Sequence, residues 1–315
     1  MIKKKISTII PCYNELLNIL PMYNRLSNAL SKITKNWEII YVDNGSTDKS
    51  FEIFSKLAAK DKRVTIVQFS RNFYKSQGAY SAGIDYATGD AAVLIDGDLQ
   101  DPPELVGKMV ELWQKGYEIV YGVRRIREGN PLRNFAYKLF YRIFNRLSYI
   151  DIPQDVGDFS LMDRKVLDVI KAMPEKNRYI RGLRAWVGFK SIGIPYKRSE
   201  RKAGKTSNSL IDNIQWALLG IFSFSYMPLA LISWVAVVSC ILSAIAIIIY
   251  LILYFMIPEA PRGFQTLLVS VLFLGSVQLL SLSIIAYYVG KIFEEVKGRP
   301  KYVIKQILND HRSKK

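Results

Sequence analysis

Between residue 5 and about residue 125, short apolar runs of strand character alternate with amphipathic helical patterns. The runs are Ile6–Ile10, Trp37–Val42, Val64–Phe69, Ala91–Ile95 and Tyr117–Tyr121, and the helical patterns lie around 15–31, 48–60, 76–87 and 103–115. Regular alternation of strand and helix is typical of a mostly parallel sheet with helices on both faces. We therefore predict an α/β fold for this part of the chain.

Two long stretches without a charged residue follow later in the chain, at Leu229–Ile257 and Gly263–Gly290. Each exceeds the roughly 20 residues that a helix needs to cross a bilayer core, so both are predicted to be transmembrane helices. Buried core helices are the alternative, but uncharged stretches of this length are rare in soluble folds. The short connector 258–262 predicts a helical hairpin whose two ends lie on one side of the membrane.

Two other segments are candidates for the membrane surface. The segment 131–147 mixes aromatic residues and arginines at helical spacing, which suits an interfacial helix or a core helix with snorkelling arginines. The segment 207–226 is amphipathic and leads into the first span. We therefore divide the chain into a large N-terminal domain at 1–205, interfacial amphipathic helices at 206–227, a transmembrane hairpin at 228–290 and a basic tail at 291–315.

The formal net charge is +17, and basic residues crowd both ends of the predicted hairpin. They are Arg198, Arg201, Lys202 and Lys205 before it and Lys291, Lys297, Arg299 and Lys301 after it, whereas the connector holds only Arg262. By the positive-inside rule, the N-terminal domain and the tail lie in the cytoplasm. Anionic lipid headgroups explain the charge better than nucleic acid does. No cleavable signal is expected, because Met1–Lys5 leads directly into the first strand-like run.

Cysteine and histidine are too scarce for several classes of site. Cys12 lies in the first strand region and Cys240 within a predicted span, so a disulfide is not expected and a reducing compartment is indicated. The one histidine, His311, lies in the polar tail. Histidine-based catalytic triads and multi-histidine zinc sites are therefore excluded.

Two carboxylates follow the fourth strand-like run at the point where it ends. Asp96 and Asp98 are two residues apart in an extended segment, so both can face one ligand. Carboxylates at the carboxyl end of a buried strand suit a hard divalent cation, and such a cation usually holds phosphates. A solvated acidic loop is the alternative for these residues taken alone.

Polar residues also follow the first two strand-like runs. The first run ends in Pro11, which cannot continue a strand ladder, and presents Tyr13 and Glu15 after it. The second run ends at Asp43, a position from which an acidic residue often accepts a hydrogen bond from a ribose or base. Because parallel strands end at the same sheet edge, that edge is predicted to bind a nucleotide.

Four segments in one order carry a family resemblance: Pro11–Glu15, Val42–Asp48, Ala87–Asp90 and Asp96–Glu104. Together they resemble a family 2 glycosyltransferase of the dolichol-phosphate mannose synthase type, most nearly the bacterial polyprenyl-phosphate glucosyltransferases with a two-helix membrane hairpin. The resemblance covers about residues 1–290. It implies a nucleotide-sugar-binding, glycosyltransferase A-like sheet, a cytoplasmic catalytic domain at 1–205, and an integral protein of the cytoplasmic membrane.

The resemblance also implies roles for residues of the donor site. Residues that hold the base and ribose of a nucleotide sugar are matched by Pro11, Tyr13, Glu15 and Asp43. Asp96 matches a residue that contacts the donor.

Metal and catalytic roles come from the same resemblance. Asp98 and Gln100 match ligands of a divalent cation, Mg²⁺ or Mn²⁺, that bridges the donor diphosphate. Asp158 matches the acidic residue near the attacking acceptor, so Asp158 and Asp96 are the expected catalytic residues. Gly97 stands where alanine is commoner in the family, and this departure is expected to be harmless.

Basic residues near the predicted nucleotide edge are candidate phosphate ligands, since an arginine fork makes two parallel bonds to a phosphate. In the family, such segments close over the diphosphate or bind the lipid phosphate. The residues concerned are Arg124, Arg125, Arg127, Arg201 and Lys205. Positive-inside charge without a ligand is the alternative for each arginine, and Lys202, Thr206 and Asn208 depart from the usual family wording.

The expected reaction is inverting, metal-dependent transfer of a hexose to polyprenyl phosphate at the cytoplasmic membrane face, to supply glycan modification. UDP-glucose is the donor suggested by the closest likeness, with GDP-mannose or an amino-sugar nucleotide as alternatives. A processive polysaccharide synthase is disfavoured because the chain has no Gln-x-x-Arg-Trp segment. A non-catalytic membrane-anchored binding protein is disfavoured by the intact acidic residues. Packed hairpins make a homo-oligomer plausible.

Overall fold

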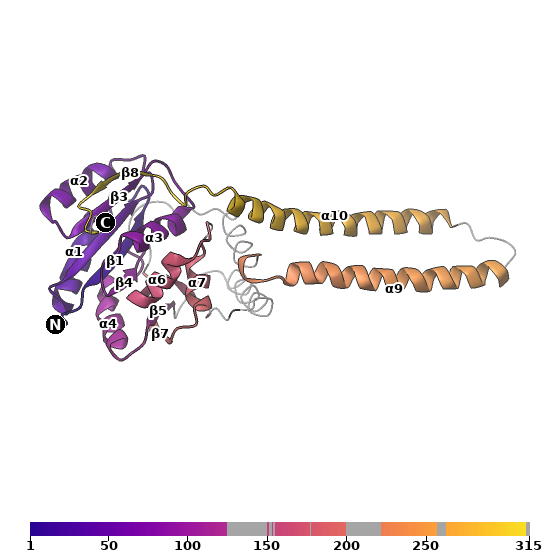
Figure 1. The fold of residues 1–315 in the computed structure, drawn as a ribbon, viewed down its shortest axis with the longest axis horizontal. Helices are drawn as coiled ribbons and strands as arrows, with labels where there is room; N and C mark the ends of the chain where they lie inside the picture. The colour runs from indigo at the N-terminus through magenta and orange to yellow at the C-terminus, as the bar shows by residue number, and fades with distance from the viewer. Residues whose placement is uncertain are drawn as a thin grey trace. The chain divides into compact units, whose positions relative to one another are not determined.

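The computed structural model describes residues 1–124, 150, 153, 155–176, 178–199, 222–256 and 263–312. The chain divides into two compact units (Figure 1). The first comprises Met1–Asn145, Ile150–Gly220 and Arg299–Lys315, and the second comprises Arg146–Tyr149 and Ile221–Gly298. We describe each unit by itself.

An eight-stranded mixed sheet forms the centre of the first unit, in the order β7-β5-β6-β4-β1-β2-β3-β8. The strands are β1 (Ile6–Cys12), β2 (Trp37–Asp43), β3 (Val64–Phe69), β4 (Ala91–Leu94), β5 (Ile119–Arg124), β6 (Val156–Asp163), β7 (Ser191–Tyr196) and β8 (Ile304–Leu308). The strands β1 to β4 pair in parallel, as do β5 and β7, whereas β6 and β8 run antiparallel to their neighbours. The predicted mostly parallel α/β fold is confirmed. The sequence did not predict β6, β7 or β8.

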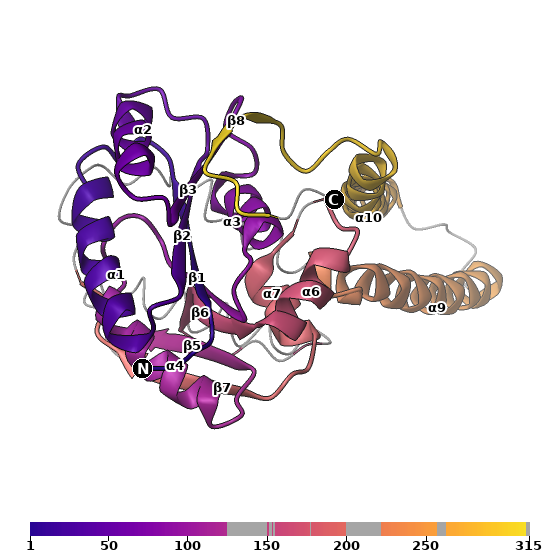
Figure 2. The same cartoon turned by 60° about the vertical axis from the view of Figure 1, so that its left-hand side comes forward.

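Helices cover both faces of this sheet (Figure 2). One face carries α1 (Ile19–Ile33), α2 (Ser50–Lys60) and α4 (Val106–Gln114), which follows the short 3₁₀ turn η1 (Pro103–Leu105). The other face carries α3 (Lys75–Tyr86), α6 (Arg164–Ala172) and α7 (Ile180–Trp186). The unit is therefore a three-layer sandwich, as strand–helix alternation requires.

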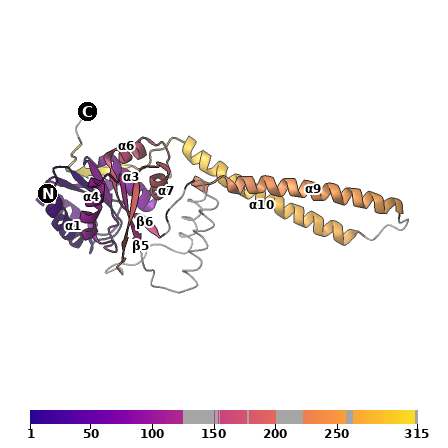
Figure 3. The same ribbon diagram turned by 90° about the horizontal axis from the view of Figure 1, so that it is seen from below.

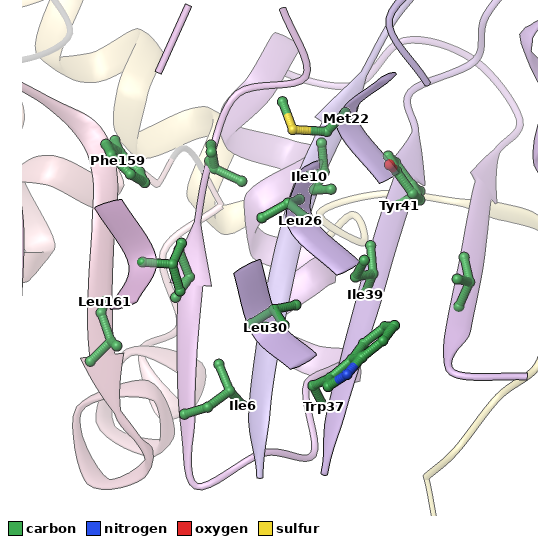
Figure 4. Close-up of a cluster of buried hydrophobic side chains, with 14 of the residues drawn as sticks. Ile6, Ile10, Met22, Leu26, Leu30, Trp37, Ile39, Tyr41, Phe159 and Leu161 are labelled. Atoms are coloured by element: carbon green, nitrogen blue, oxygen red, sulfur yellow. The ribbon is translucent and has the colours of Figure 1, made fainter. Parts of the chain in front are cut away.

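The main hydrophobic core lies between α1 and the central strands (Figure 4). Side chains at alternate positions of β1, such as Ile6 and Ile10, pack against Met22, Leu26 and Leu30 of α1, and all five are fully buried. The intervening Ile9 faces α3, where a Cβ on Gly83 would collide with its Cγ2 atom. Burial of β1 on both faces explains its nearly continuous apolar sequence.

The last strand, β8, lies antiparallel along the β3 edge of the sheet. Tyr302, just before it, stacks on Phe69 with ring centroids 5.0 Å apart and donates a hydrogen bond to Asp85 at 2.7 Å. Gln306 donates to Gln68 at 2.7 Å. Part of the segment expected to be a basic tail is thus a strand of the sheet, because its apolar residues cover an otherwise exposed edge.

The second unit contains two long helices, α9 (Met227–Met256) and α10 (Phe264–Val296) (Figure 3). Within them, Met227–Ile249 and Leu267–Val296 are long and apolar enough to cross a membrane, with mean hydropathies of 2.7 and 2.2. Their large apolar side chains are exposed, including Trp234 at 69% and Phe273 at 62%. Such a surface is not what the core helices of a soluble fold present. The connector 258–262 lies outside the described residues.

Candidate functional site

The carboxyl ends of β1, β2 and β4 meet at one edge of the sheet, because these strands are parallel neighbours. The strand β6 runs the opposite way beside β4, with Leu94 paired to Ser160. Continuing that register by two residues sets Asp158 across from Asp96. The topology therefore brings the acidic turn after β4 and the expected acceptor-side aspartate to one place.

One face of α3 holds both of these aspartates. Tyr80 donates a hydrogen bond from its hydroxyl to Oδ1 of Asp96 at 2.7 Å, and Gln77 donates from Nε2 to Oδ2 of Asp158 at 3.1 Å. The Gln77 oxygen accepts from the backbone N–H of Ile180 at 2.7 Å, which also fixes the start of α7. Residues three apart lie on one helix face. Sequence reasoning missed both α3 residues, although they are large polar side chains among the small residues of this helix.

The acidic turn that follows β4 is compact and partly buried. Leu99 adopts a left-handed conformation with φ 60°, and the Gln100 N–H donates to Oδ1 of Asp98 at 3.1 Å. Burial, and then the charge of neighbouring Asp96, raises the pKa of Asp98 to about 6, although Arg198 opposes this. Asp101 is fully buried and accepts a hydrogen bond from the Tyr196 hydroxyl. Negative charge is thus concentrated where a cation would be stabilised.

Arg198 contacts all three aspartates of this turn. Its guanidinium nitrogens lie 3.8 Å from Asp96, 3.6 Å from Asp98 and 3.4 Å from Asp101. Two hydrogen bonds between Gln100 and Ser199, at 3.0 and 3.2 Å, tie the same segment to the turn. The sequence had marked Arg198 only as positive-inside charge, so its role at the site was missed.

The donor set fits a divalent cation. Asp98 offers carboxylate oxygens beside Asp96, and Gln100 uses its amide nitrogen toward Ser199, which leaves its oxygen as the group available to a metal. Among the described residues, no three carboxylate, thiol or imidazole groups form a complete protein ligand set. Such a site suits Mg²⁺ or Mn²⁺, because these ions commonly share one or two carboxylates with substrate phosphates.

The loops after β1 and β2 are joined to one another. Asn14, at φ 55°, donates from its backbone N–H to the Ser46 hydroxyl at 3.0 Å, and its side-chain oxygen accepts from the Thr47 N–H at 2.8 Å. Tyr13 is 39% exposed beside this joint, and Glu15 lies in the same loop. The prediction that the first strand ends at Pro11 is wrong, because β1 continues to Cys12 and Pro11 pairs with Val42. These predicted donor-site residues therefore gather at the expected edge.

Asp43 is also at this edge, but its side chain is fully buried. Its two oxygens accept hydrogen bonds from the Ser46 N–H at 3.0 Å and from Gln68 Nε2 at 3.2 Å. In this conformation Asp43 holds the loop after β2. A direct bond to a nucleotide remains a prediction for it.

Gly97 lies between the two aspartates of the turn, close against β1. A Cβ at this position would come within 2.9 Å of Cys12 Sγ and 3.0 Å of the Pro11 carbonyl oxygen. The expectation that glycine is harmless here stands untested, but an alanine would require β1 or the Cys12 side chain to shift.

The predicted basic ligands are only partly covered by the structure. Arg124 ends β5, and its Nε donates to the Tyr196 hydroxyl at 3.4 Å. Burial lowers its pKa, but Tyr196 and Asp101 more than offset this and keep it raised. Arg125, Arg127, Arg201 and Lys205 lie outside the described residues, as does the segment 131–147.

The chain is similar in sequence to known glycosyltransferases. Residues 7–171 match the glycosyl transferase family 2 profile. The chain is 42% identical to an uncharacterized glycosyltransferase of Bacillus subtilis, covering 95% of this chain and 93% of that protein. It is 37% identical to a prophage bactoprenol glucosyl transferase homolog of Escherichia coli, covering 96% and 99%, and 38% identical to a prophage-derived bactoprenol glucosyl transferase of Shigella flexneri, covering 96% and 98%.

Among solved structures, a mannosyltransferase from Pyrobaculum calidifontis in complex with GDP-Man and Mn²⁺ is similar over 95% of this chain and 89% of that one. The identity is 16% and the TM-score 0.45.

Proposed function

We propose that this chain, which belongs to glycosyl transferase family 2, transfers a hexose from a nucleotide sugar to polyprenyl phosphate. The observation that carries the proposal is the similarity to bactoprenol glucosyl transferases over 96% of the chain, which extends beyond the sheet through both apolar helices. UDP-glucose is the proposed donor. The proposed location is the cytoplasmic face of the cytoplasmic membrane, with the hairpin as anchor.

The donor binds at the carboxyl edge of the sheet in this proposal. Tyr13 and Glu15 lie beside the base and ribose, and the acidic turn faces the diphosphate. Asp98 and Gln100 would hold a divalent cation, which would neutralise charge on the departing nucleoside diphosphate. Arg198, which the three aspartates now hold, is close enough to contribute positive charge to the same group.

The acceptor attacks from the side of Asp158. An oxygen of the lipid phosphate bonds to the anomeric carbon of the sugar, and the bond from that carbon to the donor diphosphate breaks, with the electron pair leaving on the diphosphate. Attack opposite the leaving group inverts the anomeric configuration. A phosphate monoester has its second pKa at about 6, so at neutral pH it attacks without first losing a proton. Asp158 therefore orients the acceptor more than it removes a proton.

The proposal predicts unequal losses for two substitutions. Asp98→Ala removes a metal ligand and should lower kcat/KM by about a thousandfold, whereas Asp158→Asn keeps the shape of an orienting group and should retain clearly more activity. The assay uses the full chain in lipid nanodiscs with polyprenyl phosphate, a panel of radiolabelled nucleotide sugars, and added Mg²⁺, Mn²⁺ or EDTA.

Asp168→Asn, at an exposed aspartate of α6, is the matched control. Absence of sugar in the lipid phase for every donor would refute the proposed reaction. Equal or reversed losses in the two variants would refute the assigned roles while leaving the reaction in place.

A further inference from the structure

Three arginines lie near Asp158 and the preceding Gly157, and two of them come from α7, a helix that packs beside β6 (Figure 3). Arg181 Nε lies 4.0 Å from Asp158 Oδ1. Arg184 donates from Nη2 to the carbonyl oxygen of Gly157 at 3.2 Å. Arg124, from β5, lies over the same glycine, because a Cβ there would be 2.6 Å from its Nη2 atom. Arg181 thus contacts the Asp158 carboxylate, whereas Arg184 and Arg124 lie against the backbone of the residue before it.

The cluster contains a buried guanidinium whose hydrogen bonds are incomplete. Arg184 is only 4% exposed, and burial lowers its pKa to about 10, which still leaves it charged at neutral pH. Its Nη1 atom and Oδ1 of Asp158 are buried without a hydrogen-bond partner among the described residues. A buried guanidinium with an unused donor is costly unless an anion completes its bonds. The cluster is therefore suited to an anionic ligand.

The exposure of the side chains shows which group such a ligand meets first. Arg181 is 19% exposed and Asp158 12% exposed, so both border solvent, whereas Arg184 lies beneath them. Arg184 also faces the Tyr121 ring at 5.3 Å and holds the backbone that carries Asp158. We infer that Arg181 binds the phosphate monoester of the acceptor beside Asp158, and that Arg184 is a positioning residue for this subsite. The inference rests on the proposed function.

The acceptor subsite and the donor side of the site differ in charge. The turn after β4 concentrates three aspartates, which suits a diphosphate only when a cation accompanies it. A phosphate monoester carries about −1.5 to −2 charges at neutral pH and would be repelled by Asp158 alone. Arginines on α7 and β5 offset that repulsion without a metal. They let a nucleophilic phosphate and an orienting carboxylate lie side by side.

The test separates binding of the acceptor from binding of the donor. Full-length protein in phosphatidylcholine nanodiscs is assayed with farnesyl phosphate as a soluble acceptor and the active nucleotide sugar as donor. Arg181→Gln should raise the KM for farnesyl phosphate about tenfold to a hundredfold, with the donor KM unchanged within about twofold, and Arg181→Lys should restore part of the loss. Arg184→Gln should raise the same KM less.

Arg178→Gln is the control matched for burial. Arg178 is 2% exposed near the start of α7, but it donates to the carbonyl oxygens of Lys171 and Met173. It should lose stability without raising the acceptor KM. An Arg181→Gln variant whose acceptor KM is unchanged, or whose donor KM rises instead, would overturn the inference.

Isothermal titration calorimetry measures acceptor binding directly and does not require the proposed reaction to occur. Wild-type protein should bind farnesyl phosphate but not farnesol, and Arg181→Gln should lose that binding. Equal binding of the alcohol would overturn the subsite. Competition by phosphatidylglycerol nanodiscs against farnesyl phosphate at this site would assign the arginines to lipid headgroups and also overturn it. If no polyprenyl phosphate is glycosylated but phosphate-specific binding to Arg181 persists, the proposed function fails and the subsite stands.

Discussion

Arg198 places a guanidinium within 3.4 to 3.8 Å of Asp96, Asp98 and Asp101. This one positive charge offsets much of the negative charge of the three aspartates. The same aspartate oxygens would also suit a divalent cation. The guanidinium and a cation compete for these oxygens, since each is stabilised by the same negative charge. Protein residues therefore influence the affinity for the metal from outside its ligand set.

This competition predicts the effect of removing the arginine. Arg198→Gln should tighten Mn²⁺ binding to the donor-free protein by about tenfold, as measured by the electron paramagnetic resonance signal of free Mn²⁺. Arg25→Gln is a control of the same chemistry, because Arg25 pairs with Glu104 through two bonds of 2.8 and 2.7 Å on an exposed surface. Weaker Mn²⁺ binding in Arg198→Gln would show that the guanidinium supports the cation rather than competing with it.

At the scale of elements, the strands β1 to β5 and the helices between them could be predicted because each carries its own apolar pattern. The strands β6, β7 and β8 could not. β6 and β7 lie beyond the region of regular alternation, and β8 pairs Ile66 with Leu308 across most of the chain. Local patterning does not contain a pairing partner that far away. The basic residues around β8 led to the prediction of a basic tail there.

The attachment of β8 predicts a stability loss confined to that edge. Tyr302→Ala removes the stack on Phe69 and the hydrogen bond to Asp85, so it should lower the free energy of unfolding of the sheet unit by about 2 kcal/mol. Val303→Ala is the control, because Val303 is 44% exposed. Hydrogen exchange should rise along β8 and β3 first. An unchanged exchange pattern along β3 would show that β8 contributes little.

At the scale of the whole molecule, the distribution of charge predicts the orientation of the helical hairpin in the membrane. Basic residues flank the two apolar helices on the side of their outer ends, whereas the connector 258–262 holds one arginine and one glutamate. From this distribution, the positive-inside rule predicts that both ends of the hairpin lie in the cytoplasm.

Cysteine labelling tests this orientation. In a background with Cys12 and Cys240 replaced by alanine, Glu259→Cys should react with a membrane-impermeant maleimide in intact spheroplasts, and Lys297→Cys should react only after permeabilisation. The two positions are expected to label under different conditions, because each predicted span crosses the bilayer once and so places them on opposite sides. Reaction of both positions before permeabilisation would rule out the hairpin, and the reverse order would invert the topology.

The sequence by itself determined the class of the sheet, the two apolar helices, and the position of Asp96 and Asp98 after a strand end. Each depends on local periodicity or on residues that follow a strand end, and both are properties of contiguous chain. Gln100 was predicted only through the family resemblance. Only the tertiary structure decided that Arg198 neutralises the acidic turn, that Gln77 and Tyr80 hold the two aspartates, and that α7 brings Arg181 and Arg184 to Asp158. These groups are far apart in sequence, and their charges interact only because the fold buries them together.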